Sequence, residues 1–327
     1  MSDRDAAMVA AAMAAMEKYT GVVPGHRRAH ARGHGFAGHF EATAAVARLT
    51  VAEHLQGDRV DAVVRLSNGA GSPYAPDLQS ARHGATLGLG IEFALPSSGR
   101  TTWAAPNMTA FPAGTPEEFI AVTTAQRRNA RGHRNPLRLL AFVARHPRTI
   151  PGLMALVGHP PLRSFAAADY HGLHAYYLVD GAGRRQAFRY HWTSTMADER
   201  TVTAREAALW PPQFLVEEMR QRVARGPVRW ELTFELAHDG DPTDDQLRAW
   251  PASRTRLHAG TLTLTEEHPD QDVVDGMVFD PTDVPPGIEC SGDPLLAFRS
   301  AVYSASHAAR TRETKPMSDL GGAGREG

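Results

Sequence analysis

The chain has 327 residues, a formal net charge of −1 and 42% hydrophobic residues, so it is long enough and apolar enough to bury a large core. The near-zero charge excludes a general attraction to nucleic acid or to anionic lipid. Cys290 is the only cysteine, which excludes an intrachain disulfide and a cysteine metal cluster.

The ends of the chain differ from its middle. Residues 1–20 predict a helix rather than a signal peptide, because Glu17 and Lys18 close it without a cleavage pattern. Residues 313–327 are rich in glycine and poor in apolar side chains, which predicts a disordered tail. No linker divides residues 21–312, so we expect one domain there. No apolar run is long enough to cross a bilayer, and we place the protein in the cytoplasm without a membrane partner.

The pattern of apolar residues predicts strands and helices that cluster rather than alternate. Strands are expected at residues 38–49, 62–67, 87–95, 174–179, 186–192, 228–237 and 257–266. Thr115 followed by Pro116 predicts the start of a helix that runs to about Arg128, and Asn135 starts another that extends towards His146. A third follows the prolines at 211–212. This arrangement favours an α+β fold in which helices are appended to an antiparallel sheet.

Near the C-terminus, Arg299 and Tyr303 are four residues apart in a segment expected to be helical, so they share one face. A guanidinium beside a phenol favours the phenolate, which is a hard, anionic ligand suited to ferric haem. The spacing alone is more typical of an ordinary surface helix that carries a neutral tyrosine.

Other motifs give this pair a context. They read RRAHARG at 27–33, GHFEAT at 38–43, VRLSNG at 64–69, PEEF at 116–119, GLHAYYLVD at 172–180 and FDPTDVPPGIE at 279–289. In this order they resemble the haem catalases, and more closely their small relatives, the catalase-related peroxidases. The resemblance covers most of residues 20–312. It implies a catalase-like antiparallel β-barrel core with an appended helical layer, and haem b as the cofactor.

The resemblance also implies roles for single residues. His30 corresponds to the distal histidine that moves protons during peroxide cleavage, with Ser67 supporting its ring and Asn107 orienting the peroxide. Tyr303 corresponds to the axial ligand of the iron, and Arg299 would keep it ionised. The remaining positions implied to bind the cofactor are Arg27, Arg65, Phe111, Phe119, His307 and Arg310.

Two positions depart from the usual catalase pattern. Pro112 follows Phe111 where the family commonly has a second phenylalanine, and Glu92 stands where a lysine is common. A changed distal wall favours entry of an organic donor, so we expect a peroxidase that reduces hydrogen peroxide, oxidises small organic donors and has weak catalase activity. The alternatives are a dedicated biosynthetic haem enzyme and a haem carrier or sensor without turnover. A homodimer is compatible with the resemblance.

A rival interpretation concerns the histidines at 26, 30, 34 and 39, which invite a non-haem metal site. The glycines at 33, 35 and 38 make one continuous helix through them unfavourable, and a strand or loop would not gather all of them on one face. The transition-metal site therefore stays the weaker alternative, and His26, His34 and His39 have no assigned role.

Overall fold

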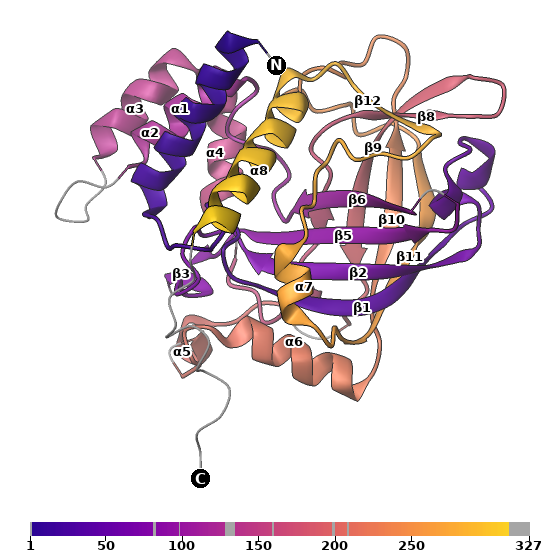
Figure 1. Ribbon diagram of the computed structural model, residues 1–327, viewed down its shortest axis with the longest axis horizontal. Helices are drawn as coiled ribbons and strands as arrows, with labels where there is room; N and C mark the ends of the chain where they lie inside the picture. Colours follow the sequence, from indigo (N-terminus) through magenta and orange to yellow (C-terminus); the bar gives the residue numbers. More distant parts are fainter. Residues whose placement is uncertain are drawn as a thin grey trace.

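The computed structural model describes residues 2–80, 83–97, 99–127, 135–158, 160–197, 200–207 and 209–313. It confirms the expected α+β class, because one large antiparallel sheet curls around a core while most helices gather beside one end of it (Figure 1). Of the predicted tail, only Glu313 is described, and it accepts a hydrogen bond of 2.5 Å from Arg28; residues 314–327 lie outside the described residues.

The sheet follows the strand order β12-β8-β9-β10-β11-β1-β2-β5-β6, and all of these neighbours are antiparallel. Its strands are β1 (Gly33–Ala42), β2 (Arg59–Asn68), β5 (Leu87–Leu95), β6 (Gly99–Pro106), β8 (Tyr176–Val179), β9 (Arg185–Ser194), β10 (Val228–Leu236), β11 (Arg256–Glu267) and β12 (Ile288–Cys290). A short β7 (Tyr170–His171) pairs with β9, and β3 (Leu78–Ser80) pairs with β4 (His83–Gly84). The curl brings β9 against β6, where Tyr190 donates a hydrogen bond of 3.0 Å to the Ala104 carbonyl.

The helices are α1 (Asp3–Thr20), α2 (Pro116–Ala125), α3 (Pro136–Arg145), α4 (Ile150–Val157), α5 (Ala204–Ala207), α6 (Phe214–Arg225), α7 (Gln271–Gly276) and α8 (Pro294–Arg312). Short 3-10 turns occupy Val46–Arg48, Glu53–Leu55, Pro147–Thr149 and Phe165–Ala167. Helix α1 packs against α2 and α8, which joins the two ends of the chain in one helical layer (Figure 1).

Two of the three predicted helix starts are confirmed by side-chain caps. Thr115 accepts a hydrogen bond of 3.2 Å from the Glu118 amide, and Asn135 accepts one of 3.0 Å from the Leu137 amide. Each cap satisfies an amide that the helix leaves without an internal partner. Helix α2 ends at Ala125, so the predicted extension to Arg128 is too long, and residue 128 itself lies outside the described part.

The strand predicted at residues 38–49 is wrong at both ends. Strand β1 begins five residues earlier, at Gly33, and residues Val46–Arg48 form a 3-10 turn. The glycines that argued against a continuous helix lie in this strand: a Cβ atom at Gly38 would lie 2.0 Å from the Thr263 carbonyl oxygen on β11. Glycine therefore permits a close approach of two backbones here, instead of breaking the strand.

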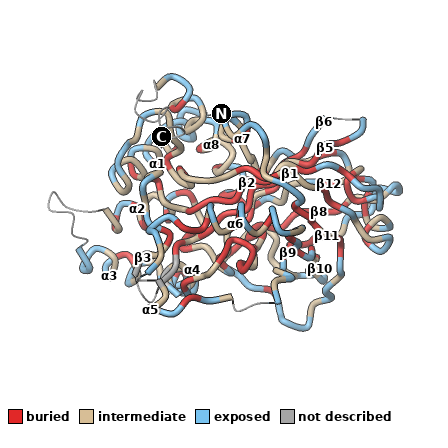
Figure 2. The backbone as a smooth tube through the Cα atoms, turned by 90° about the horizontal axis from the view of Figure 1, so that it is seen from below, coloured by how far each residue is buried: buried red, intermediate tan, exposed pale blue. Residues whose placement is uncertain are grey.

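The main core fills the inside of the curled sheet, and Figure 2 shows buried residues along most of its strands. Trp192, Trp230, Phe36, Phe40 and Phe93 are completely buried in it. A second cluster joins α1 to α8 and contains Val9, Ala12, Leu295, Phe298 and Val302. These two cores flank the helix α8 that carries Tyr303.

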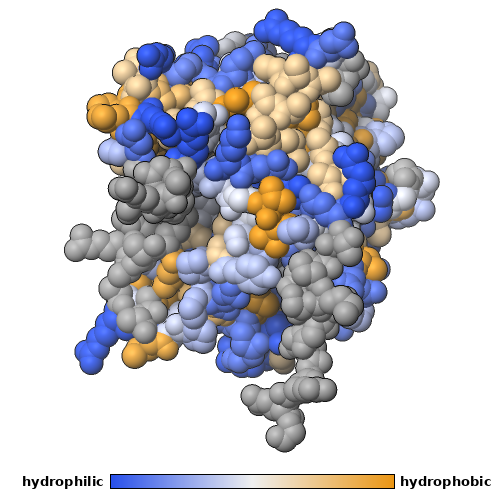
Figure 3. Space-filling model, turned by 60° about the vertical axis from the view of Figure 1, so that its left-hand side comes forward, coloured by the Kyte–Doolittle hydropathy of each residue, from blue (hydrophilic) through white to orange (hydrophobic). Residues whose placement is uncertain are grey.

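On the face shown in Figure 3, the surface is mainly hydrophilic and apolar side chains form separate patches. Leu137 and Leu140 on α3 and Met154 on α4 are among the exposed large apolar residues. Among the helices that the structure describes, none combines the length and apolar character needed to cross a membrane.

Candidate functional site

His30 has a strained backbone. With φ of 54° it is the one described residue other than glycine in the left-handed region. Three contacts hold it there: its amide donates to the Gly69 carbonyl (3.3 Å), its carbonyl accepts from Arg65 (3.0 Å), and its Nδ1 lies 2.9 Å from Ser67 Oγ. A conformation that costs about 1–3 kcal/mol persists only where the surroundings impose it, so the position of this imidazole is specified.

Glycine at position 88 makes room for the imidazole. Gly88 on β5 lies opposite Ser67 on β2, and a Cβ atom at Gly88 would come within 2.6 Å of His30 Cε1 and 2.8 Å of Ser67 Oγ. The Ser67 hydroxyl donates to the Gly88 carbonyl at 3.3 Å, so its oxygen is left to accept the proton of His30 Nδ1. This network assigns the tautomer in which His30 Nε2 carries the lone pair.

The electrostatic surroundings keep His30 neutral. Burial lowers its pKa to about 3, and the positive charges of Arg65, Arg299 and Arg27 act in the same direction. The residue as a whole is nevertheless half-buried rather than fully buried. A neutral imidazole with a free Nε2 can accept a proton across the whole physiological pH range.

Asn107 lies at the same end of the sheet as His30. It follows Pro106, which pairs with Gly88, and its Oδ1 accepts a hydrogen bond of 2.8 Å from the Leu87 amide. That contact fixes the orientation of the side-chain amide. Its NH₂ group makes no hydrogen bond with a described residue, so it can donate to a ligand.

On α8, Tyr303 is the end of a chain of hydrogen bonds. Arg299 donates to the Tyr303 phenol oxygen at 2.7 Å, and its other terminal nitrogen donates to His174 Nε2 at 2.9 Å. His174 Nδ1 then lies 2.7 Å from an oxygen of Asp293, which is the N-cap of the same helix. His174 and Asp293 are buried, so this network is shielded from water.

The partners of His174 fix its protonation. Because a guanidinium can only donate, Nε2 must accept, and the single proton of the neutral ring lies on Nδ1, where it is donated to Asp293. Burial lowers the pKa of His174 to about 4 although Asp293 opposes this shift. Burial also disfavours the charge on Arg299, but the oxygens of Tyr303, Tyr176 and Tyr190 outweigh it and raise the pKa of Arg299.

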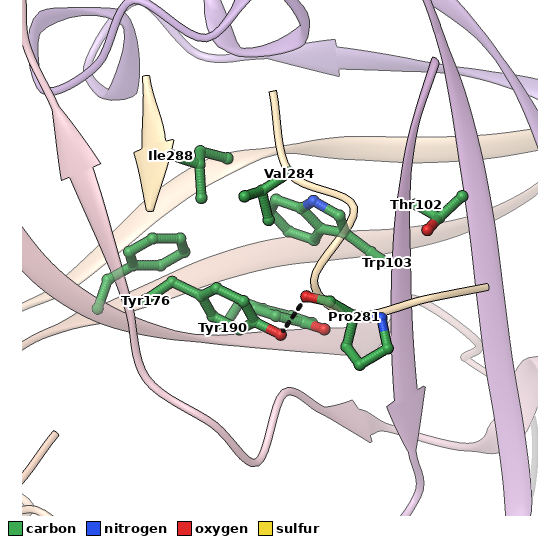
Figure 4. Close-up of a pocket in the computed structure, with 8 residues that line it drawn as sticks. Thr102, Trp103, Tyr176, Tyr190, Pro281, Val284 and Ile288 are labelled. Atoms are coloured by element: carbon green, nitrogen blue, oxygen red, sulfur yellow. Dashed lines mark hydrogen bonds between the residues drawn. The ribbon is translucent and has the colours of Figure 1, made fainter. Parts of the chain in front are cut away.

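Aromatic side chains close the space behind this network. Figure 4 shows Trp103, Tyr176 and Tyr190 beside Pro281. Tyr176 donates a hydrogen bond of 3.0 Å to the Pro281 carbonyl, and the rings of Trp103 and Tyr190 are 4.5 Å apart. The enclosed cavity between them measures about 10 Å³, which leaves room for no ligand larger than a water molecule. The residues in Figure 4 are therefore a supporting wall.

A cluster of arginines forms the third part of the site. Arg65 and Arg27 reach the carboxylate of Asp275 at 3.1 and 3.4 Å, and Arg310 donates to its backbone carbonyl at 2.8 Å. Burial and then the charges of Arg65 and Arg310 lower the pKa of Arg27. Arginine stays protonated in proteins even so, which means that the repulsion within the cluster persists.

The charge of this cluster is a test of whether haem fits. Three guanidiniums face one carboxylate, so two positive charges are left without a partner in the cluster. The two propionates of haem would match that excess, since guanidiniums pair well with carboxylates. A phenol oxygen that can ligate iron and a neutral imidazole complete a donor set suited to the group. The residues present therefore fit haem.

The remaining predicted site residues flank these three parts. Phe111 stacks on Phe119 with ring centres 6.1 Å apart, and Phe119 meets Phe298 of α8 at 6.1 Å. This aromatic row packs against the α1–α8 cluster that contains Val302, next to Tyr303. His307 Nδ1 accepts a hydrogen bond of 3.0 Å from Arg310, which ties it to the arginine cluster.

The other histidines of the N-terminal segment do not form a metal site. His34 Nε2 lies 2.7 Å from Glu267, and His39 lies 3.7 Å from Glu41. Within the described ranges, no group of three or more histidine, cysteine, aspartate or glutamate side chains could hold a metal ion.

Sequence reasoning missed His174, Asp293 and Asp275. A signal existed for two of them, because His174 lies in the motif at 172–180 and Asp293 precedes Pro294 as an N-cap does. Asp275 gave no local signal, since its partner Arg65 is 210 residues away in the sequence.

Known proteins are similar to this chain over most of its length. The sequence model of the family described as Catalase matches residues 12–317. A catalase-related peroxidase of Mycolicibacterium paratuberculosis is 37% identical over 89% of this chain and 91% of its own length, and one of Synechococcus elongatus is 32% identical over 92% and 88%.

The larger enzymes are more distant in sequence. A catalase of Streptomyces coelicolor is 27% identical, and this chain covers 60% of it. Among solved structures, a bacterial catalase has a TM-score of 0.77 at 22% identity, and catalase A from Saccharomyces cerevisiae has 0.77 at 20%. Each structure aligns with 88% of this chain, while 58% and 62% of the larger proteins are covered. With its family match, its relatives and its fold in agreement, this chain belongs to the catalase family.

Proposed function

We propose that this protein is a haem-dependent oxidoreductase that reduces hydrogen peroxide with electrons from small organic donors and has weak catalase activity. The observation that carries the proposal is the environment of His30. This neutral imidazole lies within electrostatic reach of Arg299, which donates to Tyr303, and of Arg27 and Arg65 in the arginine cluster. A proton-transfer group, a candidate iron ligand and an anion site are therefore neighbours.

Each residue has a defined task in this proposal. Haem b, when bound, would supply the redox-active iron; Tyr303 would be the residue that ligates this iron, and Arg27, Arg65 and Arg310 would pair with the propionates. His30 Nε2 accepts the proton of one peroxide oxygen and delivers it to the other, so that water can leave. Ser67 holds the His30 tautomer, and the Asn107 amide donates a hydrogen bond that orients the peroxide.

The names of the relatives support peroxidase activity, rather than catalase activity, as the main reaction. Two relatives above 30% identity carry the name catalase-related peroxidase, and this chain covers most of each. The proline after Phe111 removes one aromatic residue from the distal wall, which favours approach of a donor. A cytoplasmic location and a homodimer remain predictions from the sequence.

A paired assay on the haem-loaded protein tests the proposal. We expect phenol oxidation at a steady peroxide supply to exceed oxygen evolution from peroxide alone, relative to a large catalase measured in parallel. Vigorous oxygen evolution with negligible phenol oxidation would contradict the peroxidase emphasis. Inactivity in both assays would instead favour a dedicated biosynthetic haem enzyme, and failure to bind haem would refute the proposal entirely.

A further inference from the structure

An open cavity of about 500 Å³ lies on α8 beside the residues of the candidate site. It is lined by Arg100, Val278, Asp280, Thr282, Asp283, Ser304 and His307. Its helical wall begins at Ser304, directly after Tyr303, and includes His307, which accepts a hydrogen bond from Arg310. The cavity therefore lies on the helix that carries Tyr303 and adjoins the arginine cluster through His307, and its volume is typical of small-molecule sites.

The opposite wall is the segment between α7 and β12, which runs alongside α8 (Figure 1). Asp280 anchors it: one carboxylate oxygen accepts from the Thr282 amide and hydroxyl at 2.8 Å each, and the other accepts from Ser300 at 2.5 Å. The backbone carbonyl of Asp283 is fixed as well, because it accepts from Thr101 at 2.6 Å. The lining on this side is therefore held in place by hydrogen bonds.

Asp283 differs from Asp280 in one respect that matters for binding. Its carboxylate makes no hydrogen bond and no ion pair with a residue that the structure describes. Asp283 is an exposed residue. Desolvation of its carboxyl group and the charge of Asp280 raise the pKa of Asp283, while the charge of Arg100 opposes this shift, so a further cation beside Asp283 would favour its ionised form.

Arg100 is the one cationic side chain in the cavity lining, and it has an acidic neighbour. Arg100 lies 3.6 Å from Glu92 on the adjacent strand. With Asp280 and Asp283 against Arg100, the charged side chains of the lining sum to a net negative charge, while Val278 adds an apolar contact and Ser304 a hydroxyl. A small organic cation with an aromatic or phenolic body matches this lining.

We propose that this cavity binds the organic electron donor and selects a small phenol that carries a protonated amine. The inference rests on the proposed peroxidase function. In the overall reaction, two phenol molecules each lose one electron and one proton and become phenoxyl radicals. One hydrogen peroxide molecule accepts both electrons and both protons and becomes two water molecules. Asp283 pairs with the ammonium group and thereby places the phenol next to α8.

Two donors with the same phenol test this charge selection. Tyramine carries a cationic tail and 4-hydroxyphenylacetate an anionic one, so their comparison isolates charge from phenol reactivity. We expect a higher kcat/KM for tyramine in the haem-loaded protein. Asp283→Asn should raise the KM for tyramine about two- to fivefold, the range of a solvent-accessible ion pair, and should leave the KM for 4-hydroxyphenylacetate equal or lower. The preference should also weaken with added salt.

A control and a binding measurement make the outcomes distinguishable. Asp58→Asn removes an exposed carboxylate outside the cavity lining and should leave both KM values unchanged. Tyramine binding to the haem-loaded protein can be measured without peroxide, from the nuclear magnetic relaxation of the tyramine ring protons. This binding should weaken in Asp283→Asn. Equal use of both phenols, with no effect of Asp283→Asn on either measurement, would overturn the donor site while leaving the peroxidase intact. Binding that depends on Asp283 without oxidation of either phenol would refute the peroxidase function and the donor role together.

Discussion

Asp293 divides its two carboxylate oxygens between a helix and a histidine. Oδ1 accepts a hydrogen bond of 2.8 Å from the Leu295 amide at the start of α8, and Oδ2 lies 2.7 Å from His174 Nδ1. The residue that starts the helix therefore also sets the tautomer of the imidazole that supports Arg299 and, through it, Tyr303. The position of α8 and the electronic environment of the phenol oxygen depend on the same side chain.

This double role can be separated by Asp293→Ser. Serine remains a good N-cap, so the helix start is retained, but the partner of His174 is lost. A buried donor without a partner costs about 1–3 kcal/mol, and we expect the free energy of unfolding to fall by that amount. The absorption spectrum of the haem-loaded protein should change as well. Asp270→Ser, at the N-cap of α7, is the matched control and should affect neither the spectrum nor the stability to this extent.

Replacement of Tyr303 by phenylalanine tests the iron ligand. The change removes the phenol oxygen that accepts from Arg299 and leaves the ring in place, so we predict loss of haem or of the tyrosinate spectrum. Tyr176→Phe serves as control, because that hydroxyl donates to the Pro281 carbonyl and should not be a ligand. Normal haem content with an unaltered spectrum in Tyr303→Phe would exclude the assignment.

His30→Ala should retain haem and lose peroxide activation. General acid–base catalysis contributes about 10²–10⁴-fold, so we expect the rate of the spectral change after rapid mixing with peroxide to fall by that factor. Ser67→Ala should have a smaller effect, since it removes only the group that holds His30 Nδ1. A wild-type rate in His30→Ala would rule out the proton-transfer role.

Gly88→Ala tests the packing that positions the imidazole. The added methyl group would lie 2.6 Å from His30 Cε1, so either the ring or strand β5 must move. We expect the rate of peroxide activation to fall while haem binding is retained. Gly181→Ala is a suitable control, because its Cβ atom would make an ordinary contact of 3.8 Å with Val51. Unchanged activation kinetics in Gly88→Ala would show that the fit around His30 is loose.

Buried neutral histidines predict a loss of stability in acid. Burial lowers the pKa of His54 to about 3 and that of His174 to about 4, whereas in the unfolded chain both titrate near about 6.5. Below that pH the unfolded chain binds protons that the folded protein does not, so the free energy of unfolding should decrease from about pH 6.5 down to about pH 4. Each histidine contributes up to about 1.4 kcal/mol per pH unit.

Urea titrations at several pH values would measure this slope. His54 is completely buried, and neither ring nitrogen has a hydrogen-bond partner among the described residues, so His54→Leu should flatten the slope and stabilise the protein at pH 5. Replacement of the exposed His258 by leucine should leave the slope unchanged. An equally steep slope in His54→Leu would show that this ring is protonated in the folded state.

Local chemistry made much of the fold predictable. Caps at Thr115 and Asn135 marked helix starts, and alternation marked strands such as β10. Strand β6 was not predicted, because its second half, with Ala104, Ala105 and Pro106, lacks an alternating pattern. The partners of the candidate site residues were not predicted for another reason. His174 and Asp293 are 119 residues apart in the sequence, and no local pattern encodes a contact over that sequence separation.

The arginine cluster has a consequence for how the protein acquires its cofactor. Until an anion arrives, the folded chain must tolerate three guanidiniums around Asp275, and their mutual repulsion opposes folding of that corner. An incoming dianion would relieve the repulsion, so cofactor loading and completion of the fold are thermodynamically linked. Cofactor supply during synthesis would then govern how much of the chain survives degradation, as well as how much of it is active.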